Sequence, residues 1–338
     1  MAEIKDWTLH KTRVEHNDVL GDFGFDDAKK IIEKNAWNDK QWWNEWLRNA
    51  DYNFTEGIAK YEIKSIKELF NKAKGENVIV VGAGRSITHD KYNQAKLRML
   101  HKIGVPIIAV DRVFNLLQSL DIMPDIVVNV DAQAIVTKFF DFNGQRLPSA
   151  VISLLASPEL FEHIKDNTDN IYGYLPQNPF SLAMQFIYNE YGKEYAGLKA
   201  GSVVFYSAVD LAIMMGFKYI CGLGNDMIYL NPDDVNETRQ TAQLQIYHIS
   251  NSELYVFTNQ SFISALNHLK LLPVIYKDVR FINCSHAEGL FIDGWIHCSF
   301  KDLDFEEEKI FNDTIKNLCS GGGKDGGNSE FKSVEYAL

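Results

Sequence analysis

A glycine-rich turn follows a run of β-branched residues in the stretch VIVVGAGRSI, residues 78–87. Gly82 and Gly84 would let the backbone come close to a ligand, and a helix beginning near Ser86 would present free N–H groups to a phosphate. The turn is not the dinucleotide-binding fingerprint, because Ile87 stands where a third glycine is required, and it lacks the Gly-Lys-Ser/Thr ending of a P-loop. Two interpretations stay open: a phosphate-binding turn, or a tight corner between a strand and a helix.

Two aspartates end the next two strand patterns along the chain. Asp111 follows VPIIAV, and Asp131 follows PDIVVNV. Because ligands of parallel sheets bind beyond the carboxyl ends of the strands, both carboxylates can face one cleft beside the glycine turn. Such a pair could bind a ribose hydroxyl, a sugar or a Mg²⁺ ion. The alternative is that each aspartate only caps the helix that follows it.

Three candidates for a catalytic base follow later strand patterns. His286 and Glu288 come after the strand at 280–284, and Asp226 comes after the strand at 218–223. Histidine has an ordinary pKa of about 6.5, which suits proton removal at neutral pH, so His286 is the first candidate. The alternatives are that His286 is a surface histidine of a loop and that Asp226 only shapes a turn.

The elements that must position these residues alternate between strand and helix patterns from residue 77 onward. This alternation indicates βαβ units, and the predicted fold is α/β, with a Rossmann-like, mostly parallel sheet and flanking helices. The predicted strands are at 78–81, 105–110, 125–130, 148–156, 218–223 and 280–284. The predicted helices between them include 88–104, 113–122 and 201–217.

The 338 residues divide by pattern into three regions. Residues 1–75 form a helical N-terminal region, 76–300 form the Rossmann-like domain, and 301–338 hold a C-terminal helix and a mobile Gly-rich tail. Trp42 and Trp46 in the first region are four residues apart and share one helix face. This face is expected to pack on the main domain or on a second subunit of a homo-oligomer, or to stack on a sugar ring.

The last part of the helical N-terminal region has its own pattern. The segment IAKYEIKSIKELFNKAKGE is predicted to continue as a helix and to end at Gly75, after a lysine-rich last turn.

The composition excludes several classes of protein. A net charge of -11 argues against nucleic-acid binding, which depends on clustered Lys and Arg. No apolar run reaches the roughly 18 residues of a membrane-spanning helix, and the start lacks the apolar core of a signal peptide. The 4 cysteines form no CxxC pair, which favours reduced thiols over zinc or disulfides. We expect a cytoplasmic protein without a membrane span.

Four motifs of this chain occur in the order of a known domain. VIVVGAGRSI and AVDRVFNLLQSLDIMPDIVVNVDAQ resemble the domain shared by bacterial motility accessory factors (Maf) and archaeal 6-hydroxymethylpterin diphosphokinase-like proteins. AGSVVFYSAVDLAIMMGFKYICGLGNDMIY is similar to the same domain's Gly-Ser-Val helix and Gly-x-Asp strand end. FINCSHAEGLFIDGW is similar to the closing segment of the accessory factors. The resemblance covers roughly residues 75–300 and implies a nucleotide-binding transferase domain there.

This resemblance implies two chemistries. The accessory factors resemble glycosyltransferases that move a nonulosonic (sialic-like) acid from a CMP-sugar to a Ser or Thr hydroxyl of flagellin. The archaeal relatives imply transfer of diphosphate from ATP to a pterin alcohol with Mg²⁺, in which Asp131 would be a metal ligand. The chain departs from the family at two places. Residues 129–133, NVDAQ, lack one acidic group of the diphosphokinase cluster, and Arg85 replaces a common proline.

The favoured hypothesis is therefore a glycosyltransferase, with the diphosphokinase as the alternative and a catalytically silent binding protein as a third class. Its partners would be CMP-nonulosonate (or ATP in the alternative) and a protein acceptor such as flagellin. No cofactor is firmly expected, although Mg²⁺ is possible. The predicted nucleotide-binding residues are Gly82, Gly84, Ser86, Asp111, Asp131, Gly201 and Ser202. The predicted catalytic residues are His286, Glu288 and Asp226.

Overall fold

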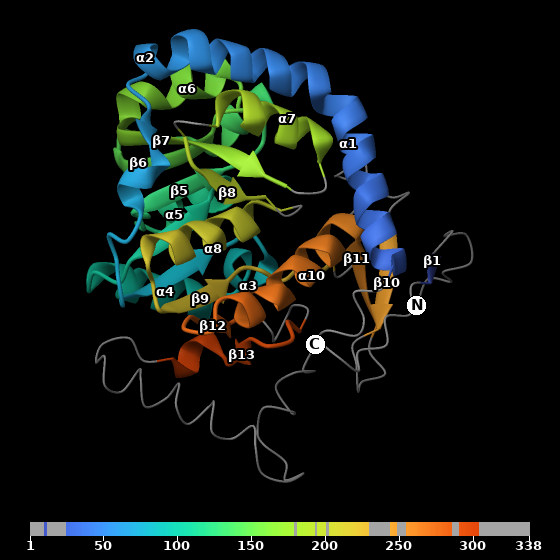
Figure 1. The fold of residues 1–338 in the computed structure, drawn as a ribbon. Coiled ribbons are helices and arrows are strands. Elements are labelled where there is room, and N and C mark those ends of the chain that lie inside the picture. Colours follow the sequence, from blue (N-terminus) through green and yellow to red (C-terminus); the bar gives the residue numbers. More distant parts are fainter. Residues whose placement is uncertain are drawn as a thin grey trace.

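The main element of the fold is a ten-stranded sheet with the order β13-β12-β9-β3-β4-β5-β6-β7-β2, in which β8 also pairs with β7 (Figure 1). The computed structural model describes residues 10–11, 25–178, 181–192, 195–200, 203–229, 244–248, 255–285 and 291–303. Every described pairing in this sheet is parallel, which confirms the predicted α/β, Rossmann-like fold. The strands are β2 (Lys64–Ser65), β3 (Asn77–Val81), β4 (Ile107–Val110), β5 (Ile126–Asn129), β6 (Leu147–Ser153), β7 (Thr168–Gln177), β8 (Gly197–Lys199), β9 (Tyr219–Leu223), β12 (Arg280–Asn283) and β13 (Ile296–His297).

Helices connect these strands. Helix α8 is apolar around most of its surface because it packs across β3, β4 and β5, and it ends at Gly216, whose φ is +91°. Helix α4 begins after Asp90, whose carboxylate accepts two backbone N–H groups. In Figure 1, α8 and α10 lie on the near face of the sheet. The helices are α3 (Arg85–Thr88), α4 (Lys91–Lys102), α5 (Phe114–Ser119), α6 (Pro158–Ile164), α7 (Leu182–Tyr191), α8 (Val204–Met215) and α10 (Gln260–Ile275).

The strand order reverses between β3 and β9. Strands β4 to β7 extend from one side of β3, whereas β9, β12 and β13 extend from its other side. In open parallel sheets a crevice forms outside the carboxyl ends of the strands at such a reversal, and ligands bind there. The topology therefore places a binding crevice beside the turn that follows β3.

Helix α1 (Phe25–Tyr52) is fixed across the carboxyl edge of the sheet by two buried asparagines. The side-chain amides of Asn49 and Asn53 donate four hydrogen bonds of 2.8–3.2 Å to carbonyl oxygens that follow β5 and β6. Because a buried amide without acceptors would cost about 1–3 kcal/mol, these bonds specify where α1 lies. The helix is thereby tied to the edge where a ligand is expected.

The predicted helix that ends at Gly75 is wrong. Only Ile58–Lys60 (α2) is α-helical, and β2 pairs with β7 as part of the main sheet. Tyr61 and Ile63 are both buried, and they lie in the turn between α2 and β2. Pairing at the edge of the sheet therefore prevails over the helix propensity of the lysines and glutamates in this segment.

A second, small sheet was not predicted. It has the order β1-β10-β11, formed by His10–Lys11, Leu244–His248 and Tyr255–Asn259, and β11 leads directly into α10. The predicted C-terminal helix and tail lie outside the described residues from 304 onward.

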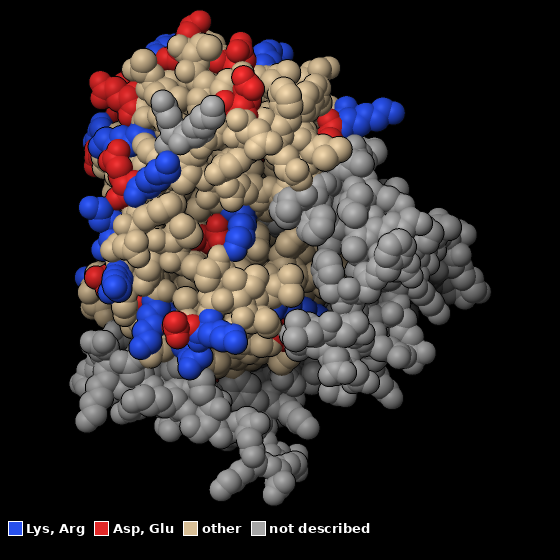
Figure 2. All heavy atoms as spheres, viewed as in Figure 1, with Lys and Arg blue, Asp and Glu red and all other residues tan. Residues whose placement is uncertain are grey.

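The described surface gives two further findings. No helix among the described residues is long and apolar enough to cross a membrane. On the described part of the face in Figure 2, Lys and Arg side chains lie among Asp and Glu side chains rather than in one continuous patch. A nucleic-acid backbone is held by clustered Lys and Arg, and this described face has no such cluster.

Candidate active site at the carboxyl edge of the sheet

A cavity of about 740 Å³ lies at the carboxyl edge of the main sheet. Its walls are the turns after β3, β4, β5 and β9, together with parts of α1 and α10. The volume is in the range of about 300–1,000 Å³ that is typical of small-molecule sites. The predicted site residues that line it are Gly82, Gly84, Asp111, Asp131 and Asp226. Residues far apart in the sequence therefore meet around one cavity, as the strand-end argument predicts.

The glycine turn packs directly against the turn after β9. The Gly82 N–H donates to the carbonyl oxygen of Leu223, the last residue of β9, at 2.7 Å, and the Gly84 N–H donates to that of Gly224 at 2.8 Å. A Cβ atom at Gly82 would lie 2.3 Å from the carbonyl oxygen of Gly224, so no side chain fits there. The glycines are needed for this contact, and their N–H groups are not available to a phosphate. The predicted contact of Gly82 and Gly84 with a nucleotide stays a prediction, and it would not use these two N–H groups.

Ser86 and Asp226 bond the two turns further. The Ser86 N–H donates to the Asp226 carboxylate at 2.8 Å, and its hydroxyl accepts the Gly224 N–H at 3.0 Å. Ser86 is buried and is not among the residues that line the cavity, and its contact with a nucleotide stays a prediction. Asp226 is also buried but does line the cavity, and its catalytic role stays a prediction.

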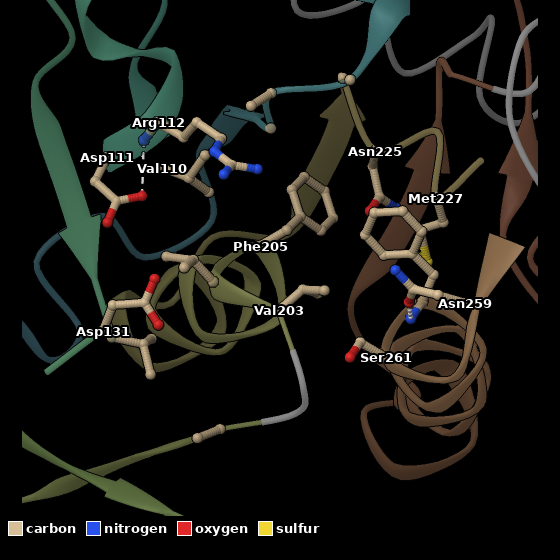
Figure 3. A pocket seen from close by; sticks show the side chains of 18 of the residues that line it. Val110, Asp111, Arg112, Asp131, Val203, Phe205, Asn225, Met227, Asn259 and Ser261 are labelled. Atoms are coloured by element: carbon tan, nitrogen blue, oxygen red, sulfur yellow. Dashed lines mark hydrogen bonds between the residues drawn. The ribbon is translucent and has the colours of Figure 1, made fainter. Parts of the chain in front are cut away.

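Asp111 and Asp131 lie at the ends of neighbouring strands on one side of the pocket (Figure 3). Asp111 is buried and accepts hydrogen bonds from the Arg112 N–H at 2.7 Å and from the Asn129 amide at 2.8 Å. It does not accept from the second or third N–H of the following turn, so it is not a helix cap. The carboxylate of Asp111 is therefore held in place by Asn129 of the neighbouring strand β5.

The environment makes Asp111 a proton-exchanging group near neutral pH. Burial raises the pKa of Asp111 to about 7, and the negative charge of Asp131 adds to the shift, while the Asn129 hydrogen bond opposes it. Loss of solvating water between the cavity walls also raises the pKa of Asp131, although part of the residue remains exposed, and the charge of Arg112 opposes this shift. A carboxyl group with such a pKa is suited to general acid–base catalysis.

Two arginines to which the sequence analysis assigned no role also line the cavity. Arg85 begins α3, and its buried Nε has no hydrogen-bond partner among the described residues. Arg112 is exposed, lies over the ring of Phe139 at 5.6 Å, and carries a charge that lowers the pKa of both cavity aspartates. Each arginine follows a strand end closely in the sequence, and that position was the signal that could have identified it.

Trp42 and Trp46 of α1 line the cavity, and Asp39 from the same helix accepts the Ser181 hydroxyl at 2.6 Å. Trp46 also packs against the hydrophobic core. This position is compatible with both predicted roles, packing on the main domain and stacking on a sugar.

Four predicted site residues lie outside the described residues: Gly201, Ser202, His286 and Glu288. Ala200 and Val203, on either side of the first two, line the cavity. Within the described ranges, no three His, Cys, Asp or Glu side chains come together as a metal site.

Comparison with known proteins identifies the family. The chain has a fold similar to that of the Maf glycosyltransferase from Magnetospirillum magneticum AMB-1, with 17% identity and a TM-score of 0.51 over 76% of this chain and 41% of that one. It therefore spans less than half the length of that protein. A search of curated proteins gives no match. The family model described as 6-hydroxymethylpterin diphosphokinase MptE-like matches residues 52–232, more than half of the chain. The predicted resemblance is thus confirmed, and the chain belongs to the MptE-like family.

Proposed function

We propose that this protein is a glycosyltransferase whose donor is a nonulosonic acid linked to CMP and whose acceptor is a protein hydroxyl, such as a flagellin Ser or Thr. One observation carries the proposal: Asp111, with a pKa of about 7, lines the cavity beside Asp131 and Arg112. A proton acceptor, a second carboxylate and a cation are the groups that glycosyl transfer requires. The fold similarity to a Maf glycosyltransferase supports it.

In the proposed reaction, the bond between the anomeric carbon and the donor phosphate breaks, and CMP leaves with the electron pair. The acceptor oxygen bonds to the anomeric carbon, and its proton passes to the ionised carboxylate of Asp111. The negative charge of Asp131 stabilises the positive charge that develops on the sugar, and the positive charges of Arg85 and Arg112, which both line the cavity, stabilise the leaving phosphate. His286 and Glu288 stay alternative bases, since both lie outside the described residues.

A second candidate is an ATP-dependent diphosphokinase that acts on a 6-hydroxymethylpterin-type alcohol. It is favoured by the family model and by the paired carboxylates of Asp111 and Asp131. Mg²⁺ commonly takes one or two carboxylates and completes its shell with water and substrate phosphates, so this pair fits such an ion. Bound there, Mg²⁺ would neutralise the negative charge of the transferred phosphates. Asp111 and Asp131 are the residues that would hold it.

A thermal-shift panel separates the candidates. CMP, CDP, AMP and ATP are each added with and without Mg²⁺, and a ligand at a hundred times its Kd adds about 2.7 kcal/mol of stability. Stabilisation by CMP without metal supports the glycosyltransferase, and stabilisation by ATP only with Mg²⁺ supports the diphosphokinase. A response to none of the four would favour a protein without this catalysis. CMP release from CMP-N-acetylneuraminate in the presence of a protein acceptor then tests the reaction itself.

A further inference from the structure

The wall of the cavity opposite the two aspartates is formed by the turn after β9 and the beginning of α10. In Figure 3, Asn225, Asn259 and Ser261 lie on one side of the pocket, and Asp111 and Asp131 lie on the other. All five residues line the cavity. One wall carries the Asp111 and Asp131 carboxylates and the Arg112 guanidinium, and the other carries amides, a helix end and the Asp226 carboxylate.

Asn225 is held rigidly, yet its amide nitrogen has no acceptor. Its backbone N–H donates to the Ser285 hydroxyl at 2.9 Å, and the Thr258 hydroxyl donates to the carbonyl oxygen of Met227 at 2.8 Å, two residues further along the turn. Asn225 is 5% exposed, and its Nδ2 is buried without a hydrogen-bond partner in the part of the chain that the structure describes. A buried donor of this kind needs an explanation, and an acceptor supplied by a ligand in the cavity is one.

The beginning of α10 adds a second, independent feature to this wall. The helix has 16 residues, so its backbone dipoles sum to a partial positive charge at its N-terminus. Asn259 caps the helix by accepting the Phe262 N–H at 2.9 Å, and both residues line the cavity. Helix N-termini of this kind bind phosphates and carboxylates.

Two other charged residues, Asp226 and Arg85, also line the cavity. Asp226 follows Asn225, but its carboxylate is bonded to the Ser86 N–H and lies within 2.2 Å of a Cβ placed at Gly84, so it is directed toward the β3 turn. Arg85, which lines the same cavity, adds positive charge. The carboxylates of the opposite wall repel an anion and so favour its binding at the α10 side.

We propose that Asn225 and the N-terminus of α10 bind an oxyanion of the substrate, a phosphate or a carboxylate. The choice of these two sources rests on the proposed function, because a CMP-linked sugar acid carries both groups. With the oxyanion held at this wall, the reacting hydroxyl faces the wall that carries Asp111. The substrate would then span the cavity between its two polar sides.

Calorimetric titration of the whole protein tests this site with inorganic phosphate, CMP and N-acetylneuraminate as probes. Asn225→Asp keeps the side-chain size but places a negative charge at the wall. We expect about ten- to hundred-fold weaker binding of the probe whose oxyanion lies there, since a hydrogen bond to a charged group is lost. Asn44→Asp makes the same change on an exposed residue of α1 and should leave all affinities unaltered. If Asn225→Asp does not fold, Asn225→Ala replaces it.

Each outcome bears on the inference. Weaker binding of phosphate and CMP identifies the nucleotide phosphate, and weaker binding of N-acetylneuraminate alone identifies the sugar carboxylate. The inference is wrong if no probe binds the wild-type protein, or if those that bind are unaffected by Asn225→Asp. Weakened phosphate binding in a protein that never turns over a CMP-sugar would keep the site and refute the glycosyltransferase. Turnover of a CMP-sugar by the wild type, together with probe binding that Asn225→Asp leaves unaltered, would keep the glycosyltransferase and refute the site.

Discussion

The β3–β9 junction and the β4–β5 edge border the same cavity but are built differently. At the junction, backbone N–H groups, the Ser86 hydroxyl and the Asp226 carboxylate bond two turns to each other. At the β4–β5 edge, Asp111 and Asp131 have raised pKa values and line the cavity. The comparison teaches that the most conspicuous motif of the sequence, the glycine turn, uses its two glycine N–H groups to join strands. The groups suited to chemistry lie on the strands beside it.

Asp111→Asn tests the β4–β5 side with the largest expected effect. If Asp111 is the base, turnover should fall by about a hundred- to ten-thousand-fold, whereas the affinity for nucleotide should change little. The initial rate of CMP release and a CMP titration measure the two quantities. Asp278→Asn, on an exposed residue, is the matched control. Unaltered turnover in Asp111→Asn would remove Asp111 from the mechanism.

The same substitution should raise stability at neutral and alkaline pH. Asp111 has a pKa of about 7 in the folded protein and an ordinary aspartate has one of about 3.9, so the folded state holds the proton more tightly. The unfolding free energy of the wild type should therefore fall as pH rises from about 4 to about 7, by up to about 4 kcal/mol from this group. The amide of Asp111→Asn does not titrate, so this variant should not show that fall in unfolding free energy.

Urea unfolding at pH 4.5, 6 and 8 measures this difference. Relative to the wild type, Asp111→Asn should become more stable with rising pH, while Asp278→Asn should follow the wild type. A constant difference across the three pH values would show that the Asp111 pKa is not raised, and the contrast between the two regions would then lose its chemical basis.

Gly82→Ala tests the β3–β9 side. The new Cβ would meet the Gly224 carbonyl oxygen at 2.3 Å, and the backbone there cannot move without breaking the junction, so we expect a loss of about 3 kcal/mol. Gly104→Ala is the control, because nothing lies within 4 Å of its Cβ and only its φ of +86° opposes alanine, at about 1–2 kcal/mol. Equal losses in urea unfolding would mean that the junction is not tightly packed.

The strands that carry the site were predictable because they are continuous apolar runs. β3, β4 and β5 are almost wholly buried, and such runs followed by Gly or Asp are typical of central parallel strands. β7 was not assigned, because TDNIYGYLPQ mixes polar residues, glycine and proline. The three residues of β8 are too few to form a pattern.

The chemistry of the site was less predictable than its location. Strand ends identified Asp111 and Asp131, but the raised pKa of Asp111 depends on burial and on a neighbour 20 residues away, and neither is visible in a local pattern. Arg85 and Asn225 were missed for a related reason. In each side chain a buried nitrogen has no hydrogen-bond partner among the described residues. This can be seen only when the positions of the surrounding turns are known.

Asp131→Asn and Arg112→Gln form the most sensitive test of the β4–β5 edge. The charge of Asp131 raises the pKa of Asp111 and the charge of Arg112 lowers it, so the two substitutions should move this pKa in opposite directions. The shift in Asp131→Asn should be partial, because burial is the larger cause and remains. Since the ionised form of Asp111 acts as the base, the rise of turnover with pH should move to lower pH in Asp131→Asn and to higher pH in Arg112→Gln. Midpoints that move in the same direction, or not at all, would show that another group controls the profile, with His286 as the next candidate.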